Sequence, residues 1–162
     1  ADVIVVTRRR APEEEAHALA RRLAARWPRA LVAAAHLSVD GVTGMRSGRR
    51  AELASLAGTR VIVAAGVADP ASLALQVGAS GATVQLVAYQ DHHPYPAADV
   101  RRLAQAAREA DYVVVTEKDA VKLRDRWPAD APEPVVAQLA VRWELNGDAV
   151  ARALEGILQR SL

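Results

Sequence analysis

The feature that most constrains this chain is the alternation of short apolar runs with helical segments in its second half. Apolar runs at 61–65, 83–89 and 112–115 are each followed by a polar turn and then by a segment with helical periodicity. Such continuous apolar runs are typical of strands that are buried on both faces of a sheet. We therefore predict an α/β fold with a mostly parallel sheet and helices on both faces, in three layers as in a Rossmann fold.

Each of these three strands is followed by polar residues. Asp69 follows the first, Asp91-His92-His93 follows the second and Glu117-Lys118-Asp119 follows the third. Ligands of open parallel sheets bind at the carboxyl ends of the strands. If the three strands are neighbours, their turns line one crevice, and that crevice is the main candidate site.

The first half of the chain contains the same elements in a less regular order. Residues 2–7 predict a buried strand, and an apolar stripe at helical spacing predicts a helix from Pro12 to Trp27. Residues 30–39 predict a second strand. The glycine-rich stretch that follows fits a small hairpin near 39–50.

The chain ends in a predicted strand at 135–143 and a helix that starts at Asn146-Gly147. Four apolar residues of this helix predict one buried stripe: Val150, Leu154, Ile157 and Leu158. A boundary near Gly58 divides the chain into residues 1–58 and 59–162, although one compact domain fits the pattern as well.

Composition excludes several classes of function. The 162 residues include no cysteine, which excludes disulfides, thiolate catalysis and cysteine-based zinc sites. The formal net charge is +2, and no basic stripe interleaved with aromatic residues indicates binding to nucleic acid. No apolar run reaches the roughly 20 residues that a membrane span needs. The sequence also lacks a phosphate loop, a dinucleotide-binding glycine motif and a nucleophile elbow.

Asp91-His92-His93-Pro94-Tyr95 is the most concentrated set of reactive side chains in the sequence. Imidazoles titrate near neutral pH and accept, donate or orient protons, and a neighbouring aspartate fixes the tautomer. A structural turn is a second interpretation. Metal binding is a third interpretation. Two observations argue against it: adjacent histidines point apart, and no further ligands follow at helical spacing. The residues alone leave all three roles open.

Two other turns have simple structural interpretations. Thr116-Glu117-Lys118-Asp119 fits a capping box, in which Thr116 caps the helix and Asp119 reaches back to it. Lys118 lies at the positive end of the helix dipole, which indicates an anionic partner or an ion pair. Asp69 precedes a proline and fits an N-cap.

Two motifs in this order resemble the C-terminal half of the tetraacyldisaccharide 4′-kinases. They are the Asp91–Tyr95 turn and, about twenty residues later, the run Thr116-Glu117-Lys118-Asp119-Ala120-Val121-Lys122. The resemblance covers most of residues 1–162, including the opening strand. One departure lies at 66–73, where many members have aromatic residues and this chain has none.

The resemblance implies a two-lobed enzyme that uses ATP and Mg²⁺ to phosphorylate the 4′-hydroxyl of the lipid A precursor, a tetraacyldisaccharide 1-phosphate. It implies an N-terminal lobe that carries the phosphate loop, the Mg²⁺-binding acids, the catalytic aspartate and the membrane-associating segment. The complete enzyme would work at the cytoplasmic face of the bacterial inner membrane. None of those motifs occurs here, so we expect the C-terminal part of a longer protein, soluble, without a cofactor of its own and inactive alone.

In this interpretation residues 1–58 are the tail of the kinase lobe or a linking segment, and residues 59–162 are the C-terminal α/β domain. His92 matches the histidine that pairs with the catalytic aspartate of the other lobe, so we expect it to be catalytic. Five residues are expected to shape or bind in the cleft: Asp91, His93, Glu117, Lys118 and Asp119.

Two alternatives belong to other classes of protein. One is a free-standing α/β module that binds a phosphorylated ligand in the same crevice. The other is a metal-dependent phosphoesterase, which needs further acidic ligands; Asp2 and Asp40 are not at convincing spacing for this.

Overall fold

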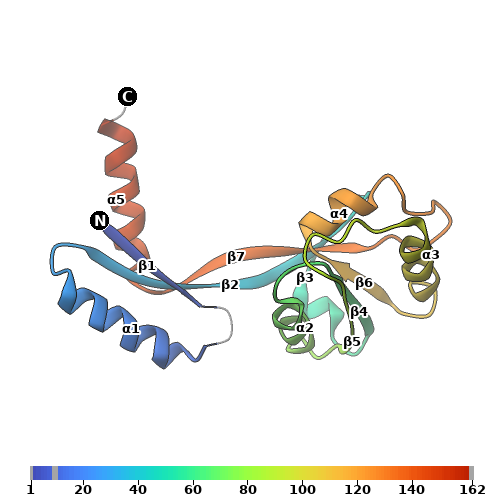
Figure 1. Ribbon diagram of the computed structural model, residues 1–162, viewed down its shortest axis with the longest axis horizontal. Coiled ribbons are helices and arrows are strands. Elements are labelled where there is room, and N and C mark those ends of the chain that lie inside the picture. The colour runs from blue at the N-terminus through green and yellow to red at the C-terminus, as the bar shows by residue number, and fades with distance from the viewer. Residues whose placement is uncertain (1, 9–10, 161–162) are drawn as a thin grey trace. The chain divides into compact units, whose positions relative to one another are not determined.

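A computed structural model describes residues 2–8 and 11–160 of the chain (Figure 1). The backbone forms two compact units, one from residues 1–38 and 140–162 and the other from residues 39–139. The units divide the chain at 38/39 and 139/140 rather than near Gly58, since residues 39–58 pack into the core of the second unit.

The secondary structure alternates strands and helices along most of the chain. The elements are β1 (Val3–Arg8), α1 (Glu13–Arg26), β2 (Leu31–Gly44), β3 (Arg50–Glu52), the 3₁₀ helix η1 (Leu53–Leu56), β4 (Arg60–Ala65), α2 (Pro70–Gly78), β5 (Thr83–Ala88), α3 (Ala97–Ala106), β6 (Tyr112–Val115), α4 (Glu117–Leu123), β7 (Val135–Leu145) and α5 (Gly147–Arg160).

The sheet of the 39–139 unit is mostly parallel. Strand β4 pairs in parallel with β5 on one side and with β6 on the other, and β6 pairs in parallel with β7. The end of β2 pairs antiparallel with β3, with Val42 opposite Ala51. The predicted α/β class and the small hairpin near 39–50 are therefore confirmed. Gly41 permits this pairing, because a Cβ there would lie 2.7 Å from the carbonyl oxygen of Ala51.

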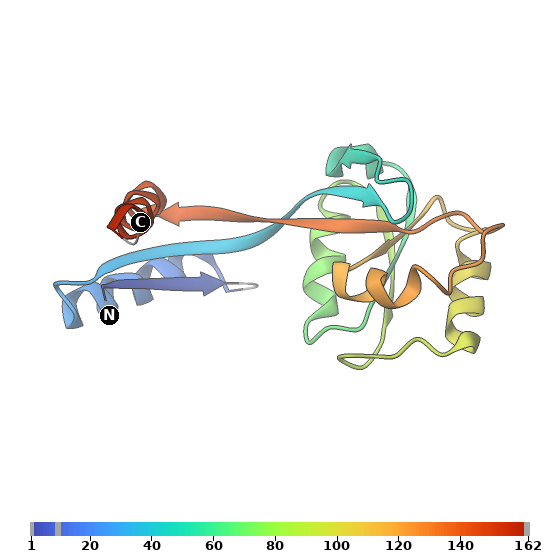
Figure 2. The same ribbon diagram turned by 90° about the horizontal axis from the view of Figure 1, so that it is seen from above.

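The strands of this unit separate two apolar cores. Ile62 and Ala64 of β4 pack with residues of α3 and α4, whereas the alternate residues Val61 and Val63 pack with α2 and η1. This alternation follows from the pleat of a strand, whose successive side chains point to opposite faces. Helices α2 and α3 accordingly lie on opposite faces of the sheet (Figure 2, α2 in green and α3 in olive). The three-layer arrangement is as predicted.

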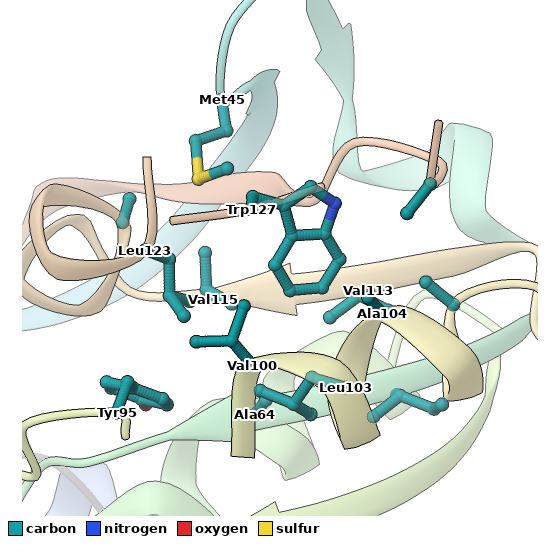
Figure 3. Packing of buried hydrophobic residues seen from close by; sticks show 14 of the residues in the cluster. Met45, Ala64, Tyr95, Val100, Leu103, Ala104, Val113, Val115, Leu123 and Trp127 are labelled. Carbon is teal, nitrogen blue, oxygen red and sulfur yellow. The ribbon is translucent and has the colours of Figure 1, made fainter. Parts of the chain in front are cut away.

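Aliphatic residues, together with Met45, Tyr95 and Trp127, fill the core beneath α3 and α4 (Figure 3). Trp127 is buried there, and its indole Nε1 donates a hydrogen bond of 3.0 Å to the carbonyl of Pro132. The sequence predicted helices that reach Ala110 and Trp127, and both predictions were too long. Helix α4 ends at Leu123, and beyond it the amides of Arg126 and Trp127 donate to the Leu123 carbonyl at 3.0 and 2.8 Å.

The other unit has a small core. Strands β1 and β2 pair in parallel, and alanines of α1 and β2 pack against Val6 and Val32. In the terminal helix α5, Val150 is buried, but the predicted buried stripe is wrong beyond it. Leu154 is 52% exposed and Leu158 is 66% exposed, because nothing in the described residues covers that face. No helix in the described part of the chain is long and apolar enough to cross a membrane.

Glu144 of β7 links three strands of this unit. Its carboxylate accepts hydrogen bonds from the Arg8 guanidinium of β1, and it lies 2.7 Å from Nδ1 of His36 in β2. The hydrogen bond from Arg8, reinforced by His36, lowers the pKa of Glu144 below its ordinary value of 4.5. The hydrogen bond between Arg8 and Glu144 also raises the pKa of Arg8.

Replacing Glu144 with Gln is expected to flatten the acid limb of the stability curve. The folded pKa lies below the unfolded one, so the ionised carboxylate stabilises the folded chain above pH 4.5, and this stabilisation is lost as pH falls. Urea unfolding at a series of pH values measures the effect. Glu155→Gln, at an exposed position of α5, is the control and should follow the parent curve. A steep acid limb in Glu144→Gln would contradict the assignment.

Candidate functional site

The turn that follows β5 is tied by its backbone to the end of β4. The amide of Tyr89 donates to the carbonyl of Ala65 at 3.0 Å, and the amide of His92 donates to the carbonyl of Gly66 at 3.1 Å. Within the turn, the amide of His93 donates to the carbonyl of Gln90 at 3.1 Å. These bonds close the turn and hold it over the carboxyl end of the neighbouring strand, where the sequence predicted it.

His92 is presented to solvent from this turn. Its backbone adopts a left-handed conformation with φ 61°, which costs a residue with a Cβ roughly 1–2 kcal/mol. The side chain is 79% exposed, and its Nε2 lies 3.8 Å from Oδ2 of Asp91. The Asp91 carboxylate also accepts the His92 amide at 3.1 Å. Asp91 therefore holds the backbone of the turn and leaves the imidazole of His92 accessible.

His93 points the other way, into the protein. Its Nε2 lies 2.8 Å from Oδ2 of Asp99, in the first turn of α3. Its ring stacks on Tyr89 with centroids 4.5 Å apart and meets the ring of Tyr95 edge-on at 5.0 Å. The two adjacent histidines therefore have different surroundings, because one is exposed and the other is enclosed by rings and a carboxylate.

Tyr95 closes the turn and is fully buried. Burial, with the nearby Asp119 carboxylate as the second cause, raises the pKa of its hydroxyl well above the ordinary value of 10. Its backbone is also left-handed, with φ 51°. Arg126 donates to the carbonyls of Pro94 and Tyr95 at 3.0 and 3.1 Å, so the chain that leaves the turn is held from beyond the end of α4.

Asp119 joins the end of β4 to the start of α4. Its side chain is fully buried, and Oδ2 accepts the Gly66 amide at 3.1 Å and the Thr116 hydroxyl at 2.6 Å. Thr116 is the N-cap that the sequence predicted, with its Oγ1 accepting the Asp119 amide at 3.2 Å. The sequence predicted that Asp119 reaches back to the cap, and its carboxylate does accept a hydrogen bond from the Thr116 hydroxyl. The same carboxylate accepts a second hydrogen bond from the Gly66 amide.

Gly66 is the point where the three turns meet. Its amide bonds to the turn after β6, and its carbonyl bonds to the turn after β5. Glu117 and Lys118 are exposed and come directly before Asp119 in sequence, at the start of α4. Asp69 caps α2 by accepting the Ser72 amide at 3.2 Å, as predicted. The described residues bring together no three His, Cys, Asp or Glu side chains that could hold a metal ion.

Sequence reasoning missed several residues that build this site. Asp99, which pairs with His93, lies six residues further along the chain, and no spacing rule connects the two. Lys122 donates to the carbonyl of His93 at 3.0 Å. Its presence in the second motif was the only available signal, and that motif assigned it no role. Gly66 resembled an ordinary strand terminator.

Comparisons with known proteins agree on one family. The family profile described as LpxK, tetraacyldisaccharide-1-P 4′-kinase, matches residues 1–159. The tetraacyldisaccharide 4′-kinase of Bradyrhizobium sp. is 36% identical over 105 residues, and that of Xanthomonas campestris pv. campestris is 40% identical over 99 residues. That of Methylobacterium radiotolerans is 38% identical over 120 residues. The matched regions cover 63%, 59% and 72% of this chain.

The curated relatives are much longer than the region they share with this chain. The matches span 31%, 27% and 35% of the three relatives, in their C-terminal part. Among solved structures, the apo form of LpxK from Aquifex aeolicus in complex with ATP is similar in fold, with a TM-score of 0.54 and 14% sequence identity. That likeness covers 98% of this chain and 51% of the solved one. The chain thus belongs to the tetraacyldisaccharide-1-P 4′-kinase family.

Proposed function

We propose that this chain is the C-terminal part of an ATP-dependent kinase that phosphorylates the 4′-hydroxyl of a tetraacyldisaccharide 1-phosphate. The observation that carries the proposal is the exposed imidazole of His92 on a closed turn, in a chain of this family that matches only part of its relatives. His92 would assist a base that the rest of the longer protein supplies. By itself the chain would be inactive.

The chemistry asks for a base and for precise positioning. In phosphoryl transfer to an alcohol, an acidic side chain accepts the proton of the attacking hydroxyl, and most of the remaining effect is electrostatic. An imidazole hydrogen-bonded to that carboxylate orients it and shares the proton. Positioned acid–base groups contribute roughly 10²–10⁴-fold to a rate. His92 fits this role because its ring is accessible and its backbone is held.

ATP and Mg²⁺ do not fit the residues of this chain alone. The sequence has no phosphate loop, and the described residues bring no three metal-ligating side chains together. We propose that the N-terminal lobe of the longer protein holds both. Asp91, Lys118 and Glu117 would then line the rim of the cleft from this side, whereas His93 and Asp119 would support the turns from within.

The unit formed by residues 1–38 and 140–162 is the proposed attachment to the rest of the protein. Large apolar side chains are exposed on it, including Trp143, Leu154 and Leu158. Exposed apolar patches mark surfaces that another body covers. The acylated substrate places the complete enzyme at a membrane surface, and we propose the cytoplasmic face of the bacterial inner membrane.

Replacing His92 with Ala in the longer protein is expected to lower kcat by about 10²-fold or more. The assay follows transfer of labelled phosphate from ATP to the tetraacyldisaccharide 1-phosphate. Asp130→Ala is the control, because it removes an exposed carboxylate that pairs with Arg108, outside the three turns, and should leave the rate unchanged. An unchanged kcat in His92→Ala would show that the proposed role of His92 is wrong.

Replacing Gly66 with Ala is expected to disturb the turn and reduce activity. The added Cβ would lie 3.1 Å from the Gln90 carbonyl oxygen and 3.2 Å from both the Asp119 carboxylate and the His93 Cβ. Overpacking of this kind costs about 1–3 kcal/mol. Thermal unfolding and kcat are measured together. Gly78→Ala is the control, since its nearest atom is 3.8 Å away. Equal behaviour of the two variants would contradict the role given to Gly66.

A further inference from the structure

His93 is held by more kinds of contact than its exposed neighbour. Its Nε2 pairs with the Asp99 carboxylate at 2.8 Å, and the two side chains are only 20% and 17% exposed. Its ring is enclosed by Tyr89 and Tyr95. A histidine committed in this way is poorly placed to exchange protons with a substrate. The contacts of His93 therefore indicate a structural role rather than a role in proton transfer.

The His93–Asp99 pair connects the turn to a rigid part of the fold. Asp99 lies in the first turn of α3, and the next residue, Val100, is buried in the core beneath that helix. On the other side, Tyr89 follows β5 and its amide is bonded to the end of β4. The imidazole of His93 thus spans from the exit of the strand to the start of the following helix.

A second connection acts on the backbone of His93. Lys122 of α4 donates from Nζ to the His93 carbonyl at 3.0 Å. His92, the residue before His93, is held by the hydrogen bond from its amide to the Gly66 carbonyl. The left-handed backbone of His92 is therefore held from both ends, which offsets the cost of that conformation.

We propose that His93 and Asp99 are positioning residues that hold the turn in the one conformation that presents the imidazole of His92. This inference rests on the proposed function of His92. A side chain whose backbone is held loses less freedom when its partner carboxylate arrives, and displacement by about 1 Å costs on the order of 10²-fold in rate. In this proposal His92 takes part in the reaction, and His93 holds the turn that carries it.

The test is a double-mutant cycle in the longer protein with Asp99→Ala, His92→Ala and the double variant. Asp99→Ala is expected to lower kcat about 10- to 100-fold with KM unchanged, since the loss lies in positioning for the reaction. In the His92→Ala background the same change should have almost no effect, because residues that act through one another are not additive. Asp99→Asn should retain most activity, since its amide oxygen still accepts the His93 proton.

Two further variants separate positioning from folding. His93→Phe keeps the stacked ring and loses the bond to Asp99, so it should reproduce the effect of Asp99→Ala if the latter does not fold. Asp130→Ala removes an exposed carboxylate that pairs with Arg108 and should leave kcat unchanged. Additive losses in the cycle, or full activity of Asp99→Ala and His93→Phe, would overturn the positioning role.

An outcome in which His92→Ala keeps full activity would contradict the proposed function instead. The positioning role is then decided by hydrogen exchange of the peptide that contains residues 89–95 in the longer protein. Faster exchange in Asp99→Ala, with Asp130→Ala unchanged, is the expected result, because the His92 amide loses its protection. Unchanged exchange in Asp99→Ala would overturn the inference.

Discussion

Two hydrogen bonds at Gly66 are the interaction on which the rest of the site depends. The amide of this residue bonds to the buried carboxylate of Asp119, and its carbonyl accepts the amide of His92. Strands β4, β5 and β6 are thereby joined beyond the point where their ladders end. A Cβ would crowd this position, because it would lie 3.1 Å from the Gln90 carbonyl oxygen and 3.2 Å from the His93 Cβ.

The bond between the Gly66 amide and Asp119 matters for stability because the carboxylate is buried. Asp119 has no exposed surface, and a buried carboxylate is costly unless hydrogen bonds satisfy it. The Gly66 amide and the Thr116 hydroxyl meet part of that need, so the structural role of the carboxylate and the geometry of the turn are coupled. The enclosed histidine adds a second anchor through α3. As a result, an exposed side chain is carried by a turn in which most of the backbone is tied down.

The general features of this site could be predicted because they depend on local patterns. Strand periodicity placed Asp91–Tyr95 at a strand end, and Asp69 before a proline predicted the cap of α2. The partnership of His93 with Asp99 could not be predicted, since it depends on where α3 lies in space. The apolar stripe of α5 was correctly seen as a stripe, but periodicity does not say what covers it. Leu154 and Leu158 are exposed because nothing in the described residues covers that face of α5.

We propose that His92 forms half of a site whose other half lies outside residues 1–162. A crystal structure of the longer protein, with a non-hydrolysable ATP analogue and the disaccharide bound, tests this directly. A carboxylate from outside these residues is expected within about 3 Å of an imidazole nitrogen of His92, near the 4′-hydroxyl. A His92 ring that faces solvent in that complex, with no carboxylate or substrate atom in reach, would show that His92 is not part of such a site.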